Sequence, residues 1–130
     1  MREDLSTLLT KAINRLQEAT KALADKDEKM LSYKVWKAAS DVEYATFLMA
    51  LSRQSENDAW KERRRVSRPL DIAVALLNAQ DLLRKAVKAL NSDIEEGYRD
   101  AWFARGHILD IQNGLDKDRI MQSRPQRPAQ

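Results

Sequence analysis

A run of positive charge near the middle of the chain is the segment best suited to bind an anion. Residues 61–68 carry five Lys or Arg side chains and one Glu, directly after Trp60. Arginine grips phosphate through paired hydrogen bonds, and an indole ring can stack on an unpaired base. One hypothesis is therefore a nucleic-acid or other polyanion interface formed by Lys61, Arg63, Arg64, Arg65 and Arg68. The alternative is a solvated connection between helices, with Trp60 in the core.

A second group of residues indicates contact with another protein. In the helix expected from residue 28 onward, one apolar stripe repeats at helical spacing, and a second stripe projects roughly opposite to it. The second stripe consists of Tyr33, Trp36, Tyr44, Phe47 and Leu51. Because aromatic side chains are enriched at the centres of interfaces, we interpret it as a homodimer or partner face. The alternative is that another part of this chain covers it.

Two polar residues fall where the last predicted helix should be apolar. Arg105 and Gln112 lie near the middle of the stripe that begins at Ile94 and Tyr98. A buried arginine is costly unless an anion or carboxylate pairs with it. The alternative places Arg105 at the margin of the core, with its stem packed and its head in water.

The sequence offers little material for catalysis or metal binding. It contains no Cys and a single histidine, His107, whereas zinc sites need several His or Cys ligands. Glu95, Glu96 and Asp100 are acidic residues near a helix start, where the helix dipole favours negative charge. Their spacing lacks the paired motifs of helical nucleotide pyrophosphohydrolases, and Arg99 and His107 lack the spacing of HEPN-type nucleases. We therefore expect no enzyme, no metal and no cofactor.

The elements that position these residues are four helices. Residues 9–23 and 76–90 share a stripe of Leu and Ala at an offset of 67, and at an offset of 66 Trp36 and Ala38 match Trp102 and Ala104. The chain is therefore interpreted as all-α, a four-helix bundle built from two tandem, and in this interpretation duplicated, antiparallel αα-hairpins. The short connections at 25–28 and 91–92 predict that the two helices within each hairpin are antiparallel.

The predicted helix ends rest on capping chemistry. Asp25, Ser67 and Ser92 are each expected to cap the helix that follows, and Asn113-Gly114 is expected to end the last one. The second helix is expected to continue beyond Leu51, with Trp60 on its core stripe if the helix is unbroken.

The length of 130 residues predicts one domain over 1–118, followed by a flexible basic tail over 119–130. The net charge of +3 is local, because it comes from the run at 61–68 and the three arginines of the tail. No apolar stretch is long enough to span a membrane or resembles a signal peptide, which favours a cytoplasmic protein. The leading functional hypothesis is a non-catalytic helical protein that acts through protein–protein contacts, as a homo-oligomer or a small subunit of an assembly; the alternative is a nucleic-acid-binding module.

Overall fold

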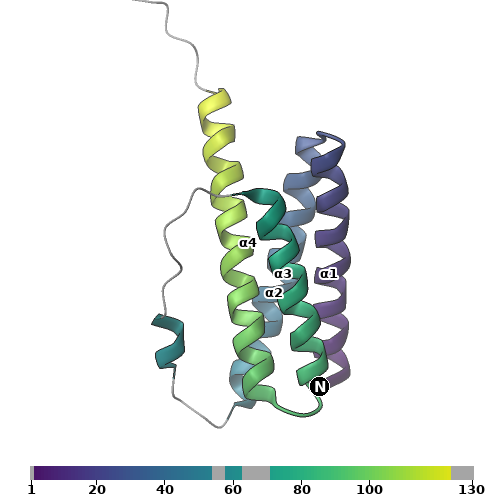
Figure 1. Ribbon diagram of the computed structural model, residues 1–130, viewed down its shortest axis with the longest axis vertical. Helices are drawn as coiled ribbons and strands as arrows, with labels where there is room; N and C mark the ends of the chain where they lie inside the picture. Colours follow the sequence, from purple (N-terminus) through teal and green to yellow (C-terminus); the bar gives the residue numbers. More distant parts are fainter. Residues whose placement is uncertain (1, 54–57, 63–70, 124–130) are drawn as a thin grey trace, which may run out of the picture.

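A computed structural model describes residues 2–53, 58–62 and 71–123 of the chain (Figure 1). These residues form four α-helices and one short 3-10 helix, and the described part contains no strand. The α-helices are α1 (Arg2–Ala24), α2 (Glu28–Ser52), α3 (Ile72–Ala89) and α4 (Ile94–Ser123), and the 3-10 helix is η1 (Ala59–Glu62). The fold is thus the helical bundle of two hairpins that the sequence predicts.

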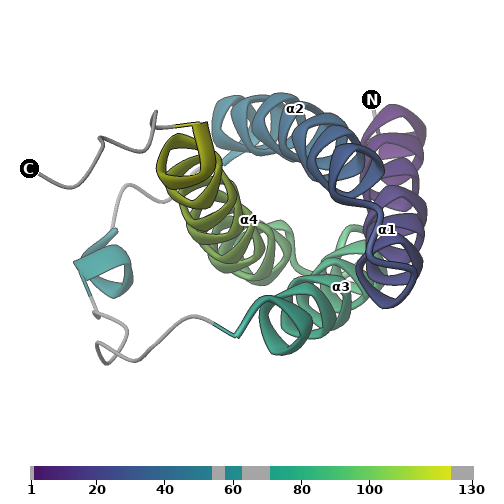
Figure 2. The same cartoon turned by 90° about the horizontal axis from the view of Figure 1, so that it is seen from above.

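The four helices surround one core in the order α1, α2, α4, α3 (Figure 2). Each helix packs on the other member of its hairpin, and the hairpins meet through α1 with α3 and α2 with α4. In Figure 1, α1 and α4 run upward whereas α2 and α3 run downward, so all four neighbouring pairs are antiparallel. Because α2 ends and α3 begins at opposite ends of the bundle, residues 53–71 connect its two ends.

The core consists of the stripes that the helical spacing predicts. Leu, Ala and Val side chains at every third or fourth position remove one face of each helix from water. The most completely buried large side chains are Leu5, Leu9, Leu16, Val35, Val42, Met49, Leu76, Leu83, Ile108 and Ile111. Gly97 lies at a close approach within this core, where an added Cβ would sit 3.3 Å from Met49 Cε and 3.4 Å from the Ala86 carbonyl oxygen.

The matched positions of the two hairpins have matching environments. Leu9 and Leu76 are both fully buried, and so are Leu16 and Leu83. The same holds for Ala38 and Ala104 at the offset of 66. The internal similarity in sequence therefore coincides with equivalent places in the bundle.

The turn between α1 and α2 uses a different cap from the one predicted. Lys26 adopts a left-handed backbone with a φ of 59°, which reverses the chain after α1. The side chain of Asp27, not of Asp25, then accepts a hydrogen bond of 3.1 Å from the Met30 N–H. The prediction of Asp25 as the cap is wrong. Both aspartates suit a cap, and the sequence does not show which residue adopts the left-handed backbone.

The caps of α3 and α4 also lie later than predicted. Asp71 caps α3 by accepting from the Val74 N–H at 3.2 Å, while Ser67 lies outside the described residues. Asp93 Oδ1 accepts from the N–H groups of Glu95 and Glu96 at 3.1 and 3.2 Å, so Ser92 is not the cap of α4. An Asp directly beside a Ser competes for the same orphan N–H groups, and here the Asp makes those bonds.

Both long helices end elsewhere than expected. α2 stops at Ser52, because Arg53 leaves it with an extended backbone at φ −77° and ψ 145°. α4 does not stop at Asn113-Gly114 but continues to Ser123, so residues 119–123 of the predicted tail are helical, and 124–130 lie outside the described residues. Leu115, one residue after Gly114, packs against the core, which favours continuing the helix over ending it. Within the described ranges no helix is long and apolar enough to cross a membrane.

Candidate functional site

The outward face of α2 carries a row of large apolar side chains, which the small residue Ser40 interrupts near its middle. We call Tyr33, Trp36, Tyr44, Phe47 and Leu51 the α2 stripe; these residues are exposed by 49, 56, 55, 58 and 67 %. Successive members lie within an arc of about 80° on a helix with 3.6 residues per turn, and the stripe spans about 27 Å. All five residues predicted as a partner face are therefore side by side on one surface and open to solvent.

Charged residues border the α2 stripe but are mostly paired within the chain. On one side Asp41 Oδ2 accepts from Arg15 Nε at 2.8 Å, and on the other Glu43 Oε1 accepts from Arg105 Nε at 2.6 Å. Lys37 Nζ lies 5.7 Å from the ring centroid of Tyr33 and 5.8 Å from that of Trp36. The border is thus polar, while its two carboxylates near the middle of the stripe are neutralised locally.

Trp36 also faces the junction between α2 and α4. Two open hollows meet at its side chain, one reaching toward Leu115 and the other toward Leu109, and Gln112 lines both. The surface available to a partner therefore extends from α2 onto the neighbouring edge of α4.

The described part of the basic run is engaged within the fold. Lys61 Nζ donates to the hydroxyl of Tyr98 at 2.8 Å and lies 4.1 Å from the ring centroid of Trp102. It also forms an ion pair of 3.3 Å with Asp58. Arg63, Arg64, Arg65 and Arg68 lie outside the described residues. Lys61 is therefore part of a packed cluster on α4, which the spacing of the basic run did not predict.

Trp60 is buried, but not in the way that an unbroken second helix requires. It lies on η1, is 9 % exposed, and meets three rings of α4 edge-on. Its ring centroid is 5.8 Å from that of Tyr98, 6.4 Å from Trp102 and 5.6 Å from Phe103. η1 is thus fixed to α4 through an aromatic cluster.

Arg53, directly after α2, contacts the same aromatic cluster and two carboxylates. Its guanidinium lies 4.2 Å from the ring centroid of Tyr98 and pairs with Asp58 at 2.8 Å and Glu95 at 3.0 Å. Burial alone would lower the pKa of Arg53, but its hydrogen bonds to Asp58 and Glu95 outweigh burial and raise it. The hydrogen bond from Arg53 lowers the pKa of the Asp58 carboxyl. Arg53 therefore remains charged and acts as a structural clamp.

The two hairpins differ in how their matched tryptophans are covered. Trp102 on α4 is partly buried beneath Trp60 and Lys61. Trp36, its match on α2, is 56 % exposed. The residues that surround Trp60 on α4 include Tyr98, Arg99 and Trp102, and their matches at the offset of 66 (Ser32, Tyr33 and Trp36) all line the open hollow beside Leu115. The open face is therefore the uncovered counterpart of a covered one.

Arg105 and Gln112 are half-buried rather than buried. The Arg105 side chain is 27 % exposed, pairs with Glu43, and lies 4.8 Å from the Trp102 ring centroid. Ala104 and Ile111, each one residue earlier in α4, take the core positions instead. The polar residues that the described core does bury are Thr46 and Gln80, and Gln80 Nε2 donates to Thr20 Oγ1 at 3.0 Å. Arg105 therefore lies at the margin of the core, which is the alternative that the sequence left open.

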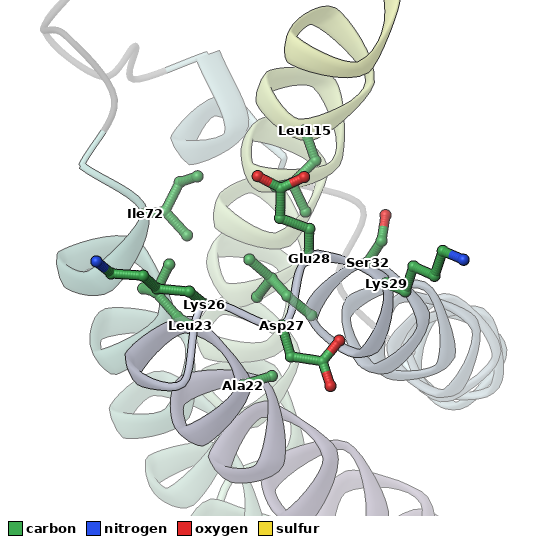
Figure 3. A pocket seen from close by; sticks show the side chains of 10 residues that line it. Ala22, Leu23, Lys26, Asp27, Glu28, Lys29, Ser32, Ile72 and Leu115 are labelled. Carbon is green, nitrogen blue, oxygen red and sulfur yellow. The ribbon is translucent and has the colours of Figure 1, made fainter. Parts of the chain in front are cut away.

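One end of the bundle is hollowed between the α1–α2 turn, the start of α3 and the last third of α4 (Figure 3). The hollow has a volume of about 500 Å³, with Ala22, Leu31 and Ile72 among its apolar lining residues. Lys26, Asp27, Glu28 and Lys29 contribute its charged groups. Asp27 is already used as a helix cap, and among the described residues no cluster of three His, Cys, Asp or Glu is placed to hold a metal ion.

Comparison of the chain with protein-family models, curated proteins and solved structures found no match.

Proposed function

We propose that this protein is a non-catalytic helical bundle that acts through protein–protein contact at the α2 stripe. The observation that carries the proposal is that four aromatic side chains and a leucine on one helix face are each about half or more exposed. Isolated exposed apolar residues are ordinary, but several on one helix face are typical of an interaction surface.

The size of the stripe supports this assignment. An aromatic side chain presents about 150–250 Å², so four that are half exposed leave on the order of 300–500 Å² of apolar surface. At about 25 cal/mol per Å², covering that surface contributes roughly 8–12 kcal/mol before the entropy of association is subtracted. Association itself costs roughly 4–15 kcal/mol, so the stripe supplies a large share of what a complex requires.

The alternative function, nucleic-acid binding by the run at 61–68, draws less support from the described residues. Lys61 is held by Tyr98, Asp58 and the ring of Trp102, and Trp60 is buried against α4. Neither side chain is free to contact a phosphate or to stack on a base. We therefore propose the α2 stripe, and not the run at 61–68, as the interaction surface.

The experiment that tests the proposal compares the proteins retained by three immobilised baits from cells of the source organism. The baits are the wild-type chain, a Trp36→Ser/Phe47→Ser variant and a Val74→Ser/Leu77→Ser variant. Val74 and Leu77 lie on α3 and are 51 and 52 % exposed, so the last variant is a matched loss of exposed apolar surface elsewhere. Quantitative mass spectrometry should identify a chain, this one or another, that the wild type and the α3 variant retain and the α2 variant loses. Equal retention by all three baits contradicts the proposal.

A further inference from the structure

We infer that the surface that covers the α2 stripe is the same stripe of a second copy, packed antiparallel about a twofold axis that lies on the stripe side of α2, at the level of Val42 along the helix. This inference rests on the proposed function and names its partner. An isologous interface requires a surface that is complementary to its own rotated copy.

The order of residues along the stripe has this self-complementarity. Tyr33 and Leu51 are equally far from Val42 along the helix, and so are Ser40 and Tyr44. Trp36 and Phe47 lie six and five residues from Val42 and fall on the same side of the stripe, toward α4. A twofold axis at the level of Val42 therefore brings Tyr33 opposite Leu51 of the second copy, and Trp36 beside Phe47 of the second copy.

Side-chain size is complementary at the middle of the pair. Ser40 is the small, exposed residue in the row, and the axis places it opposite Tyr44 of the second copy. The Ser40 hydroxyl already donates to the Trp36 carbonyl at 3.2 Å, so its burial leaves no unpaired donor. A small residue facing a large one lets two helix backbones approach without a clash or a void.

The charges near the axis do not oppose self-association. Asp41 and Glu43 flank Val42, and two copies bring four such carboxylates together. Each carboxylate is paired within its own chain, Asp41 with Arg15 and Glu43 with Arg105. Like-charge repulsion, which would otherwise exclude a second copy, is therefore neutralised before the copies meet.

The covering of Trp102 on α4 indicates how its exposed match on α2, Trp36, is covered in a dimer. On α4 an aromatic ring from outside that helix, Trp60, lies edge-on to Trp102. In the proposed pair, Phe47 of the second copy is the ring placed beside Trp36, the match of Trp102. A standard interface buries about 800 Å² per partner, and the stripe supplies about half of that area. Lys37, Met30 and the adjacent edge of α4 border the stripe and supply further area.

The first test is the dissociation constant of the dimer, measured by sedimentation equilibrium on the full chain. Wild-type protein should approach twice the chain mass of 15.0 kDa. Ser40→Glu places an unpaired charge against Tyr44 of the second copy and should weaken the dimer by about 30-fold or more. Ser40→Ala and Val74→Ser/Leu77→Ser should leave the constant within about 3-fold, since neither change introduces a charge or a clash at the seam. Circular dichroism on each variant verifies that the helices are retained.

The second test determines the register with disulfides, which the absence of native cysteines makes unambiguous. A Ser40→Cys chain is mixed with a Tyr44→Cys chain and oxidised at a concentration where the wild type is dimeric. The antiparallel pair predicts the mixed 40–44 disulfide as the main product. A parallel pair predicts the two homodisulfides instead, and that result overturns the proposed packing.

The failure of this inference is distinguishable from failure of the proposed function. A wild-type mass of 15.0 kDa at all concentrations rejects the second copy. So does a dimer that Ser40→Glu leaves unchanged. In either case the bait comparison above still decides whether a different protein binds the α2 stripe, because it detects any chain lost with Trp36 and Phe47.

Discussion

Asp93 illustrates how one side chain decides where a helix begins. Ser92 and Asp93 are both good capping residues, and Ser92 has the Glu three residues later that a capping box requires. In the folded chain Asp93 Oδ1 accepts from two N–H groups of the first turn, and the Gly97 N–H donates to the Asp93 carbonyl at 3.0 Å. The carboxylate also interacts with the positive end of the helix dipole, which a serine hydroxyl does less well.

Replacing Asp93 by Ala should therefore cost about 1 kcal/mol of unfolding free energy. The matched change Ser92→Ala should stay within about 0.5 kcal/mol, as expected for a surface residue without a cap role. Urea denaturation of both variants measures the difference. A larger loss from Ser92→Ala than from Asp93→Ala would contradict the assignment of the cap.

At the residue scale, the sequence predicts exposure and burial better than it predicts partners. Helical spacing places Trp36 and Phe47 on the side of α2 opposite its core-facing stripe, and both are exposed. It does not predict that Arg53 pairs with Asp58 and Glu95, because that cluster depends on where the backbone leaves α2. Ala104, one residue before Arg105, takes the core position, and an alanine is too small to mark the core stripe of α4 strongly.

At the scale of the element, α4 shows that a glycine permits a helix end but does not require one. None of the described glycines has a positive φ, so Gly114 adopts the helical backbone that any residue can take. Ile111 is fully buried and Leu115 packs on the core, so the segments before and after Gly114 both gain from remaining helical.

Replacing Gly114 by Ala should consequently raise the unfolding free energy by about 0.5–1 kcal/mol, because Ala loses less conformational entropy than Gly in a helix interior. If Gly114 were instead a left-handed cap, the same change would introduce strain and lower the stability. Thermal unfolding followed by circular dichroism distinguishes the two signs.

η1 lies in a segment where the sequence predicts a continuation of the second helix, and it joins the core. Trp60 packs against Tyr98, Trp102 and Phe103, which holds η1 to α4. Trp60→Ala should lower the unfolding free energy by roughly 3 kcal/mol, the lower end of the range for buried Trp. Trp60→Phe should recover part of that loss in the same urea titration. A change below about 0.5 kcal/mol for Trp60→Ala would contradict the role of Trp60 in anchoring the connection.

At the scale of the whole molecule, the sequence predicts the four helices and their pairing into hairpins but not how the hairpins join. The stripes over 5–23 and 72–90 fix which face of α1 and α3 is buried, and short turns fix the antiparallel pairs. The order of the helices around the core depends on which ends of the bundle residues 53–71 join. Their composition does not show that these are opposite ends. That order decides which helix faces remain exposed, because it places Trp102 of α4 beside Trp60 of η1 and leaves Trp36 of α2 uncovered.

The central claim is that the α2 stripe is where this molecule meets another protein. The most direct measurement is site-specific photo-crosslinking in an extract of the source cells. The cysteine-free chain is labelled with a benzophenone maleimide at Tyr44→Cys or, as a matched control, at Leu77→Cys, positions that are 55 and 52 % exposed. We predict that the label at 44 forms a discrete product, at twice 15.0 kDa if the partner is a second copy, and that the label at 77 does not. No product at 44, or the same products at both positions, would contradict the account.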